Sequence, residues 1–63
     1  MYERYAELRD LKGVTDYQVA KETGVNPAIL YSWKAGRWNP SAGTVIKLAQ
    51  YFEVPMERFY EKN

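Results

Sequence analysis

The most restrictive feature of this sequence is the very short connection between two segments that carry strong helix signals. Gly24 supplies a residue that ends a helix in the left-handed conformation, and Asn26 is a favoured N-cap for the next helix. Only Val25 lies between them. So short a connection cannot place two helices side by side along their length, and it therefore forces a steep crossing. We expect Val25 to fill the corner and the second helix to stand out from the body of the fold.

Start and stop signals predict five short helices along the chain. Thr15 and Gln18 fit a capping box, in which each side chain binds the backbone N–H of the other residue. Asn39 and Ser41 are both candidates for the cap of the fourth helix. No alternating run of residues predicts a strand, so the expected fold class is all-α, a compact helical bundle. The helices are expected at about residues 2–12, 15–24 and 27–35, from Asn39-Pro40-Ser41 to Phe52, and from about Pro55 onward, with Gly13, Gly24 and Gly36 ending the first three.

Apolar residues within these segments predict a common core. Val45, Leu48, Ala49 and Phe52 fall at i, i+3, i+4 and i+7, which places them on one face of the fourth helix. We therefore expect residues 1–63 to form a single domain. The other residues expected in its core are Tyr5, Leu8 and Leu11 in the first helix, Val19 and Ala20 in the second, Leu30 and Trp33 in the third, and Met56, Phe59 and Tyr60 in the last.

Composition argues against several classes of site. The chain has no cysteine and no histidine, which removes disulfides, the usual zinc ligand sets and histidine-based acid–base catalysis. The carboxylates are scattered, and no Ser or Lys has a candidate base beside it. We therefore predict no enzyme activity, no metal or other cofactor and no small-molecule ligand. No apolar run reaches the ~18 residues needed to cross a bilayer, so no membrane partner is expected and the predicted location is cytoplasmic.

The net charge of +1 conceals an uneven distribution along the chain. Residues 24–50 contain no Asp or Glu, while Lys34, Arg37 and Lys47 give this segment a charge of +3. Five acids against four cations before it, and three acids against two cations after it, leave −1 on each side. Such an asymmetry is typical of a surface that binds a polyanion. A stretch of small and apolar residues with little room for acids gives the same pattern, and charge alone does not separate the two interpretations.

The segment at residues 27–35 has an unusual outward face. At 100° per residue, Leu30 and Trp33 point inward, and the opposite side carries no charge. Such a narrow face fits a DNA major groove, where apolar groups contact thymine methyls and hydroxyls bind base edges. The alternatives are an ordinary exposed face or a face that packs on another protein. The outward residues are Pro27, Ala28, Tyr31, Ser32 and Ala35.

Several motifs, in their spacing, resemble the Cro/CI-type (Xre-type) helix-turn-helix family of phage repressors and bacterial regulators. With Leu8-Arg9 and Lys12-Gly13 included, the resemblance covers almost the whole chain. It implies the fold of a lambda-repressor-like DNA-binding domain. It also implies a transcriptional regulator that binds double-stranded DNA sequence-specifically, expected to be a phage or bacterial repressor or the DNA-binding domain of one. The residues that carry it are Thr15, Ala20, Gly24-Val25, Trp33-Lys34-Ala35-Gly36, Asn39-Pro40-Ser41, Leu48-Ala49 and Val54.

The resemblance also implies which residues contact DNA. Those near bases are Asn26, Pro27, Ala28, Tyr31 and Ser32, and those near the sugar–phosphate backbone are Thr15, Asp16, Lys34, Arg37, Trp38 and Asn39, with Lys34 and Arg37 as the main phosphate ligands. Many members of the family begin the second helix with Gln, where this chain has Asp16. The Asp16 carboxylate would repel phosphate unless it caps that helix. Pro27-Ala28 stand where many members have polar residues. Both departures favour apolar contacts, DNA shape or water as the source of discrimination.

The sequence leaves two alternatives open for the role of Trp38, for the role of the C-terminal segment and for the function. Trp38 fits either a hydrophobic lid over the helix junction or a donor of its indole N–H to phosphate. The aromatic C-terminal segment fits either the core or a homodimer contact, since this family usually binds two half-sites of a palindromic operator about one DNA turn apart. The alternative function is a protein-interaction module that binds another regulator through the uncharged helix.

Overall fold

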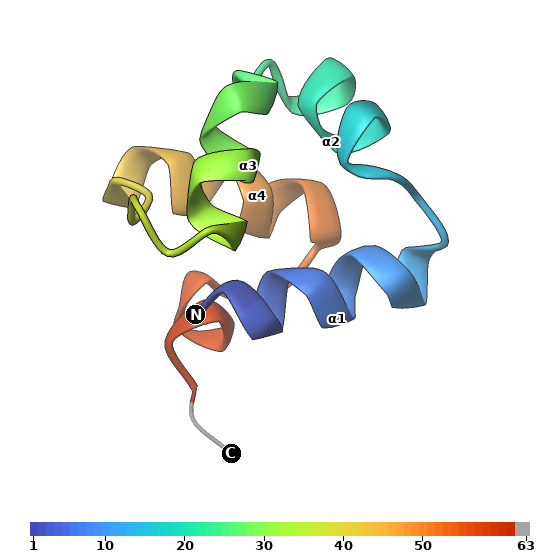
Figure 1. The fold of residues 1–63 in the computed structure, drawn as a ribbon. Coiled ribbons are helices and arrows are strands. Elements are labelled where there is room, and N and C mark those ends of the chain that lie inside the picture. Colours follow the sequence, from blue (N-terminus) through green and yellow to red (C-terminus); the bar gives the residue numbers. More distant parts are fainter. Residues whose placement is uncertain (62–63) are drawn as a thin grey trace.

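A computed structural model describes residues 1–61 of the chain. Its elements are α1 (Tyr2–Lys12), α2 (Asp16–Thr23), α3 (Pro27–Lys34), α4 (Ala42–Phe52) and a short 3-10 helix, η1 (Met56–Tyr60). Figure 1 shows α1 along one side, α3 in front of α4, and α2 above the C-terminal half of α1 and next to the start of α3, while η1 returns to the start of α1. No strand occurs within residues 1–61, which confirms the all-α fold class.

Local hydrogen bonds define where α2 and α3 begin. The backbone N–H of Gln18 donates to Thr15 Oγ1 at 3.2 Å, and the Thr15 N–H donates to Gln18 Oε1 at 3.1 Å. The predicted capping box is therefore confirmed. Asn26 Oδ1 accepts from the Ala28 N–H at 2.9 Å, and Pro27 takes the first helical position, where its missing N–H costs no hydrogen bond.

The corner between α2 and α3 forms as the sequence predicts. Gly24 adopts the left-handed conformation with a φ of 80° at the end of α2. Val25 is 6% exposed and belongs to the core, so its predicted place in the corner is confirmed. The Thr23 hydroxyl supports the turn, because it donates to the Val19 carbonyl at 2.7 Å and accepts from the Val25 N–H at 3.2 Å.

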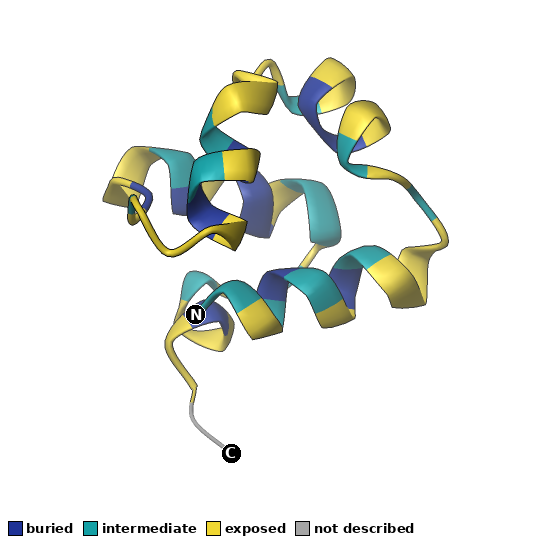
Figure 2. Ribbon diagram, in the orientation of Figure 1, coloured by how far each residue is buried: buried dark blue, intermediate teal, exposed yellow. Residues whose placement is uncertain are grey.

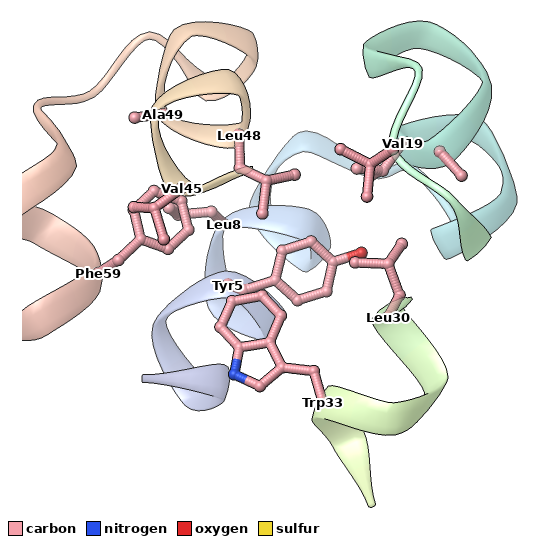
Figure 3. Close-up of a cluster of buried hydrophobic side chains, with 11 residues drawn as sticks. Tyr5, Leu8, Val19, Leu30, Trp33, Val45, Leu48, Ala49 and Phe59 are labelled. Atoms are coloured by element: carbon pink, nitrogen blue, oxygen red, sulfur yellow. The ribbon is translucent and has the colours of Figure 1, made fainter. Parts of the chain in front are cut away.

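The core gathers side chains from every element (Figure 3). Tyr5 is completely buried, and its ring centroid lies 5.2 Å from that of Trp33. Trp33 is 3% exposed, which confirms its predicted place in the core. Figure 3 shows the two rings together at the centre, with the Tyr5 hydroxyl directed toward the side of Leu30 and Val19. This packing fixes α3 against α1.

Two residues expected in the core are exposed. Leu11 is 81% exposed, because a spacing of three residues falls 60° short of a full helical turn, so Leu11 lies 120° around α1 from Tyr5. Tyr60 is 48% exposed. The last element is a 3-10 helix with three residues per turn, so Met56 and Phe59 share a face while Tyr60 is rotated away.

Two boundaries were also refined. The cap of α4 is Ser41 rather than Asn39, because the Ser41 hydroxyl accepts from the Thr44 N–H at 3.3 Å. The third helix ends at Lys34, one residue before the expected end, and Ala35 is its C-cap. Among residues 1–61, no helix combines the length and the apolar character needed to cross a membrane.

Candidate nucleic-acid interface

The outward side of α3 is open to solvent, whereas its inward side is part of the core. Leu30 is 2% exposed, and Tyr31, the next residue, is 73% exposed. Pro27 and Ala28 are also exposed, and Ser32 is half-buried at the edge of the face. Figure 2 shows exposed and buried residues succeeding one another around this helix. The structure therefore presents the predicted uncharged face to the outside.

A residue of α2 that the sequence did not single out extends this face. Tyr17 is 70% exposed, and together with Lys21 and Pro27 it lines a shallow hollow of about 260 Å³ between α2 and the start of α3. The sequence signal for Tyr17 was a large aromatic residue that falls off the buried side of its helix, which carries Val19 and Ala20. The surface formed by α2 and α3 is thus wider than α3 alone.

The Asp16 carboxylate is bound by two groups of α1. The Tyr5 hydroxyl donates to Asp16 Oδ1 at 2.6 Å, and Arg9 Nη1 donates to the same oxygen at 3.0 Å. Partial burial acts to raise the pKa of Asp16, but the hydrogen bonds from Tyr5 and Arg9 outweigh it and hold that pKa below its usual 3.8. Asp16 does not cap α2, because Thr15 performs that role. The carboxylate instead joins the first turn of α2 to α1.

Arg9 is the centre of a small polar cluster on α1. Its Nε donates to Asp10 Oδ1 at 3.1 Å, and its Nη1 donates to the Tyr2 hydroxyl at 3.3 Å as well as to Asp16. The Arg9 side chain is only 20% exposed, and the hydrogen bond to Asp16 is the main reason that its pKa is raised. The sequence pattern did not indicate this cluster, because Tyr2 and Asp16 each lie seven positions from Arg9 along the chain.

The cations expected to bind phosphate differ in their surroundings from three arginines of α1 and η1. Arg4, Arg9 and Arg58 each lie within 4.0 Å of a carboxylate oxygen. Lys34 and Arg37 are exposed, and neither forms an ion pair within residues 1–61. Both therefore remain available to an external anion. They follow one another across the end of α3, next to its exposed face.

The loop that carries Arg37 is held against the last turn of α3. The Gly36 N–H donates to the Trp33 carbonyl at 3.0 Å, and the Arg37 N–H donates to the Ser32 carbonyl at 2.9 Å. Gly36 has a φ of 75°, so its predicted left-handed conformation is confirmed. These bonds fix the backbone from which the Arg37 side chain extends, and its position relative to the face of α3 is therefore set by the fold.

Comparison with protein families gives one decisive result. A family model described as helix-turn-helix matches residues 6–59, which is most of the chain. The chain belongs to the Cro/CI-type helix-turn-helix family. Comparisons with curated proteins and with solved structures gave no match. Members of this family are DNA-binding domains of transcriptional regulators rather than enzymes, and the domain described here binds DNA.

Within this helix-turn-helix domain, Trp38 covers the junction after α3. Its side chain is half-buried and packs against the core, an arrangement that fits both the lid and the phosphate contact considered for this residue. The indole N–H donates no hydrogen bond to any residue in the range 1–61. A contact between this N–H and phosphate stays a prediction.

The predicted site residues fall into two neighbouring parts of the helix-turn-helix surface. Lys34 and Asn39 line a shallow hollow of about 320 Å³ at the start of α1. Lys34 also lies close enough to Asp16 for its charge to lower the pKa of that carboxyl. The residues of the first part are Asn26, Pro27, Ala28, Tyr31 and Ser32 on α3, and those of the second are Thr15, Asp16, Lys34, Arg37, Trp38 and Asn39 around the helix ends.

Proposed function

We propose that this domain binds double-stranded DNA in a sequence-specific manner, and that it acts as a phage or bacterial repressor or as the DNA-binding domain of one. The observation that carries this proposal is the uncharged, exposed face of α3 beside two cations without carboxylate partners in residues 1–61. A helix with such a face enters the major groove without an acidic obstruction, and Tyr31 is the one large side chain on it. The proposed location of such a regulator is the cytoplasm, which contains the phage or bacterial DNA.

Phosphate contacts set the position of the domain on the duplex. Lys34 and Arg37 bind phosphates on one side of the groove, and Asn39 and the Trp38 indole N–H donate to the same strand. The free N–H groups in the first turn of α2, after Thr15, face the phosphate backbone as well. These contacts carry no sequence information, but they fix the register in which α3 meets the bases.

Base recognition comes from the outward side of α3. Pro27 and Ala28 contact thymine methyl groups, which are the apolar feature of the major groove. The hydroxyls of Tyr31 and Ser32 and the free amide N–H₂ of Asn26 bind base edges. With so few polar groups on α3, DNA shape and bridging water contribute to discrimination. A single domain of this size makes few contacts, so we propose that two copies bind a palindromic operator as a homodimer.

Selection of bound duplexes from a random DNA pool tests the proposal directly. We expect enrichment of one short motif, and then a binding constant that falls with log salt with a slope of roughly −3 to −4, as expected for about four phosphate contacts per domain. Fluorescence anisotropy with the enriched duplex measures this slope. A pool without enrichment, together with a salt-insensitive complex with another regulator, would favour the protein-interaction module instead.

A further inference from the structure

Asp16 is an acid at the edge of a surface that is proposed to meet phosphate. Its side chain is 35% exposed, and both of its hydrogen bonds engage Oδ1. Its Oδ2 accepts no hydrogen bond from residues 1–61. The Lys34 ammonium acts on the same carboxyl electrostatically, so Asp16 and a proposed phosphate ligand lie on one edge of the domain. An unscreened carboxylate there repels the DNA backbone.

The structure places one cation where it cancels this charge. Arg9 Nη1 lies 3.0 Å from Asp16 Oδ1, and the guanidinium is held in that position by Tyr2 and Asp10 and by its approach to the Tyr5 ring, 5.7 Å from the ring centroid. A side chain with several fixed partners loses little further entropy when it pairs with the carboxylate. The pair is therefore a permanent part of the surface rather than one of several rotamers.

We propose that Arg9 is a charge-compensating residue for DNA binding: it neutralises Asp16, so that the phosphate backbone can approach the first turn of α2. This inference rests on the proposed function. Arg9 acts through Asp16 and is a positioning residue for the interface. Two unit charges about 7 Å apart interact by roughly 0.6 kcal/mol in water and by several times more where solvent is displaced, which makes the uncompensated carboxylate a measurable obstacle at low salt.

A double-mutant cycle separates this role from a direct phosphate contact by Arg9. The affinity of the full chain for its selected duplex is measured by fluorescence anisotropy at low salt for four proteins: wild type, Arg9→Gln, Asp16→Asn and the double variant. We expect Arg9→Gln to weaken binding about tenfold. Because the two charges act on phosphate independently, Asp16→Asn is expected to strengthen binding several-fold in the wild-type background and to restore the Arg9→Gln protein to within about threefold of wild type. Arg9→Lys keeps the charge and is expected to keep most of the affinity.

The remaining outcomes are equally informative. A double variant that binds as weakly as Arg9→Gln would show that Arg9 itself contacts phosphate. No gain from Asp16→Asn in either background would show that the carboxylate does not hinder the approach of phosphate. Either result overturns the inference alone. A change of base preference in Asp16→Asn would overturn it too, because Asp16 would then accept from a base such as cytosine. Failure of the wild-type chain to bind any duplex would overturn the proposed function and this inference together. Thermal melts by circular dichroism establish the temperature at which all variants are folded.

Discussion

At the scale of single residues, the hydrogen bond between Tyr5 and Asp16 links the core to the surface that is proposed to bind DNA. The Tyr5 ring is completely buried against Trp33, while its hydroxyl reaches a carboxylate at the start of α2. Burial, and then the hydrogen bond to Asp16, raise the pKa of Tyr5 far above its usual 10. The hydroxyl therefore stays protonated and remains a donor at every pH at which the domain functions.

This bond makes a prediction about stability and pH. Tyr5→Phe keeps the ring but removes the donor, and we expect it to lower the free energy of unfolding by about 1–2 kcal/mol at pH 7, since one partner is charged but partly exposed. Because the folded-state pKa of Asp16 lies below 3.8, the contribution is present above pH 3.8 and is lost as the pH falls through that lower pKa. Urea unfolding between pH 7 and pH 2.5 measures it. Tyr60→Phe, at an exposed tyrosine, is the matched control, and a Tyr5→Phe loss that is independent of pH would contradict the assignment.

At the scale of elements, the helix ends reveal one strained position. Glu53 caps α4 with a φ of 59°, and it is the only residue other than glycine with a positive φ within residues 1–61. A side chain in this conformation costs about 1–2 kcal/mol relative to glycine, and the greater freedom of glycine in the unfolded chain offsets part of that. We expect Glu53→Gly to raise the free energy of unfolding by about 0.5–1 kcal/mol in urea titrations.

Gly24 provides the matched control for that measurement. It has a φ of 80°, and a Cβ added there meets no heavy atom within 4 Å, so Gly24→Ala tests the backbone conformation without a steric clash. It should destabilise the domain by about 1 kcal/mol, with the opposite sign to Glu53→Gly. Equal signs for the two variants would show that the left-handed conformation does not govern their stability.

The helices themselves were largely predictable, because their signals are local in the sequence. Thr15, Asn26 and Gly36 act on residues within four positions, so the boundaries of α2 and α3 follow from the sequence to within one residue. Leu11 was misplaced because a spacing of three residues indicates a face only approximately. The sequence left Tyr60 open between the core and a dimer contact, and it is exposed because η1 is a 3-10 helix, which nothing in the sequence indicated.

The candidate site was less predictable than the fold. The outward face of α3 follows from its periodicity, but the contacts of its residues with DNA rest on the family resemblance and stay predictions. The partners of Asp16 lie 7 and 11 residues away on another helix, and neither helix pattern indicates that pairing. Only the tertiary fold, in which α1 and α2 both pack against α4, brings Tyr5 and Arg9 to that carboxylate. Tyr17 was overlooked for a similar reason, since its neighbour Pro27 belongs to α3.

At the scale of the whole molecule, the charges are separated in a way that net charge conceals. The arginines of α1 and η1 pair with carboxylates, whereas Lys34 and Arg37 form no ion pair within the described chain. Lys47 lies on a different surface, where it lines a shallow hollow with Glu22 and Tyr51 between α2 and α4. Lys12 and Lys21 also form no ion pair within residues 1–61. Lys34 and Arg37 are the two unpaired cations at the end of α3, where they can guide a phosphate backbone electrostatically.

This separation predicts two different kinds of loss when the surface is altered. Arg37→Ala should weaken binding to all duplexes about equally and reduce the salt slope by about 1, because a phosphate contact carries no sequence information.

Ala28→Glu places a carboxylate on the exposed face of α3. It should reduce the preference for the selected duplex over an unrelated one at least tenfold, a loss of about 1.4 kcal/mol in discrimination. Anisotropy titrations with both duplexes at several salt concentrations measure these effects, with Lys47→Ala as the control that should change neither. If Ala28→Glu left the preference intact, α3 would not be the element that reads the bases.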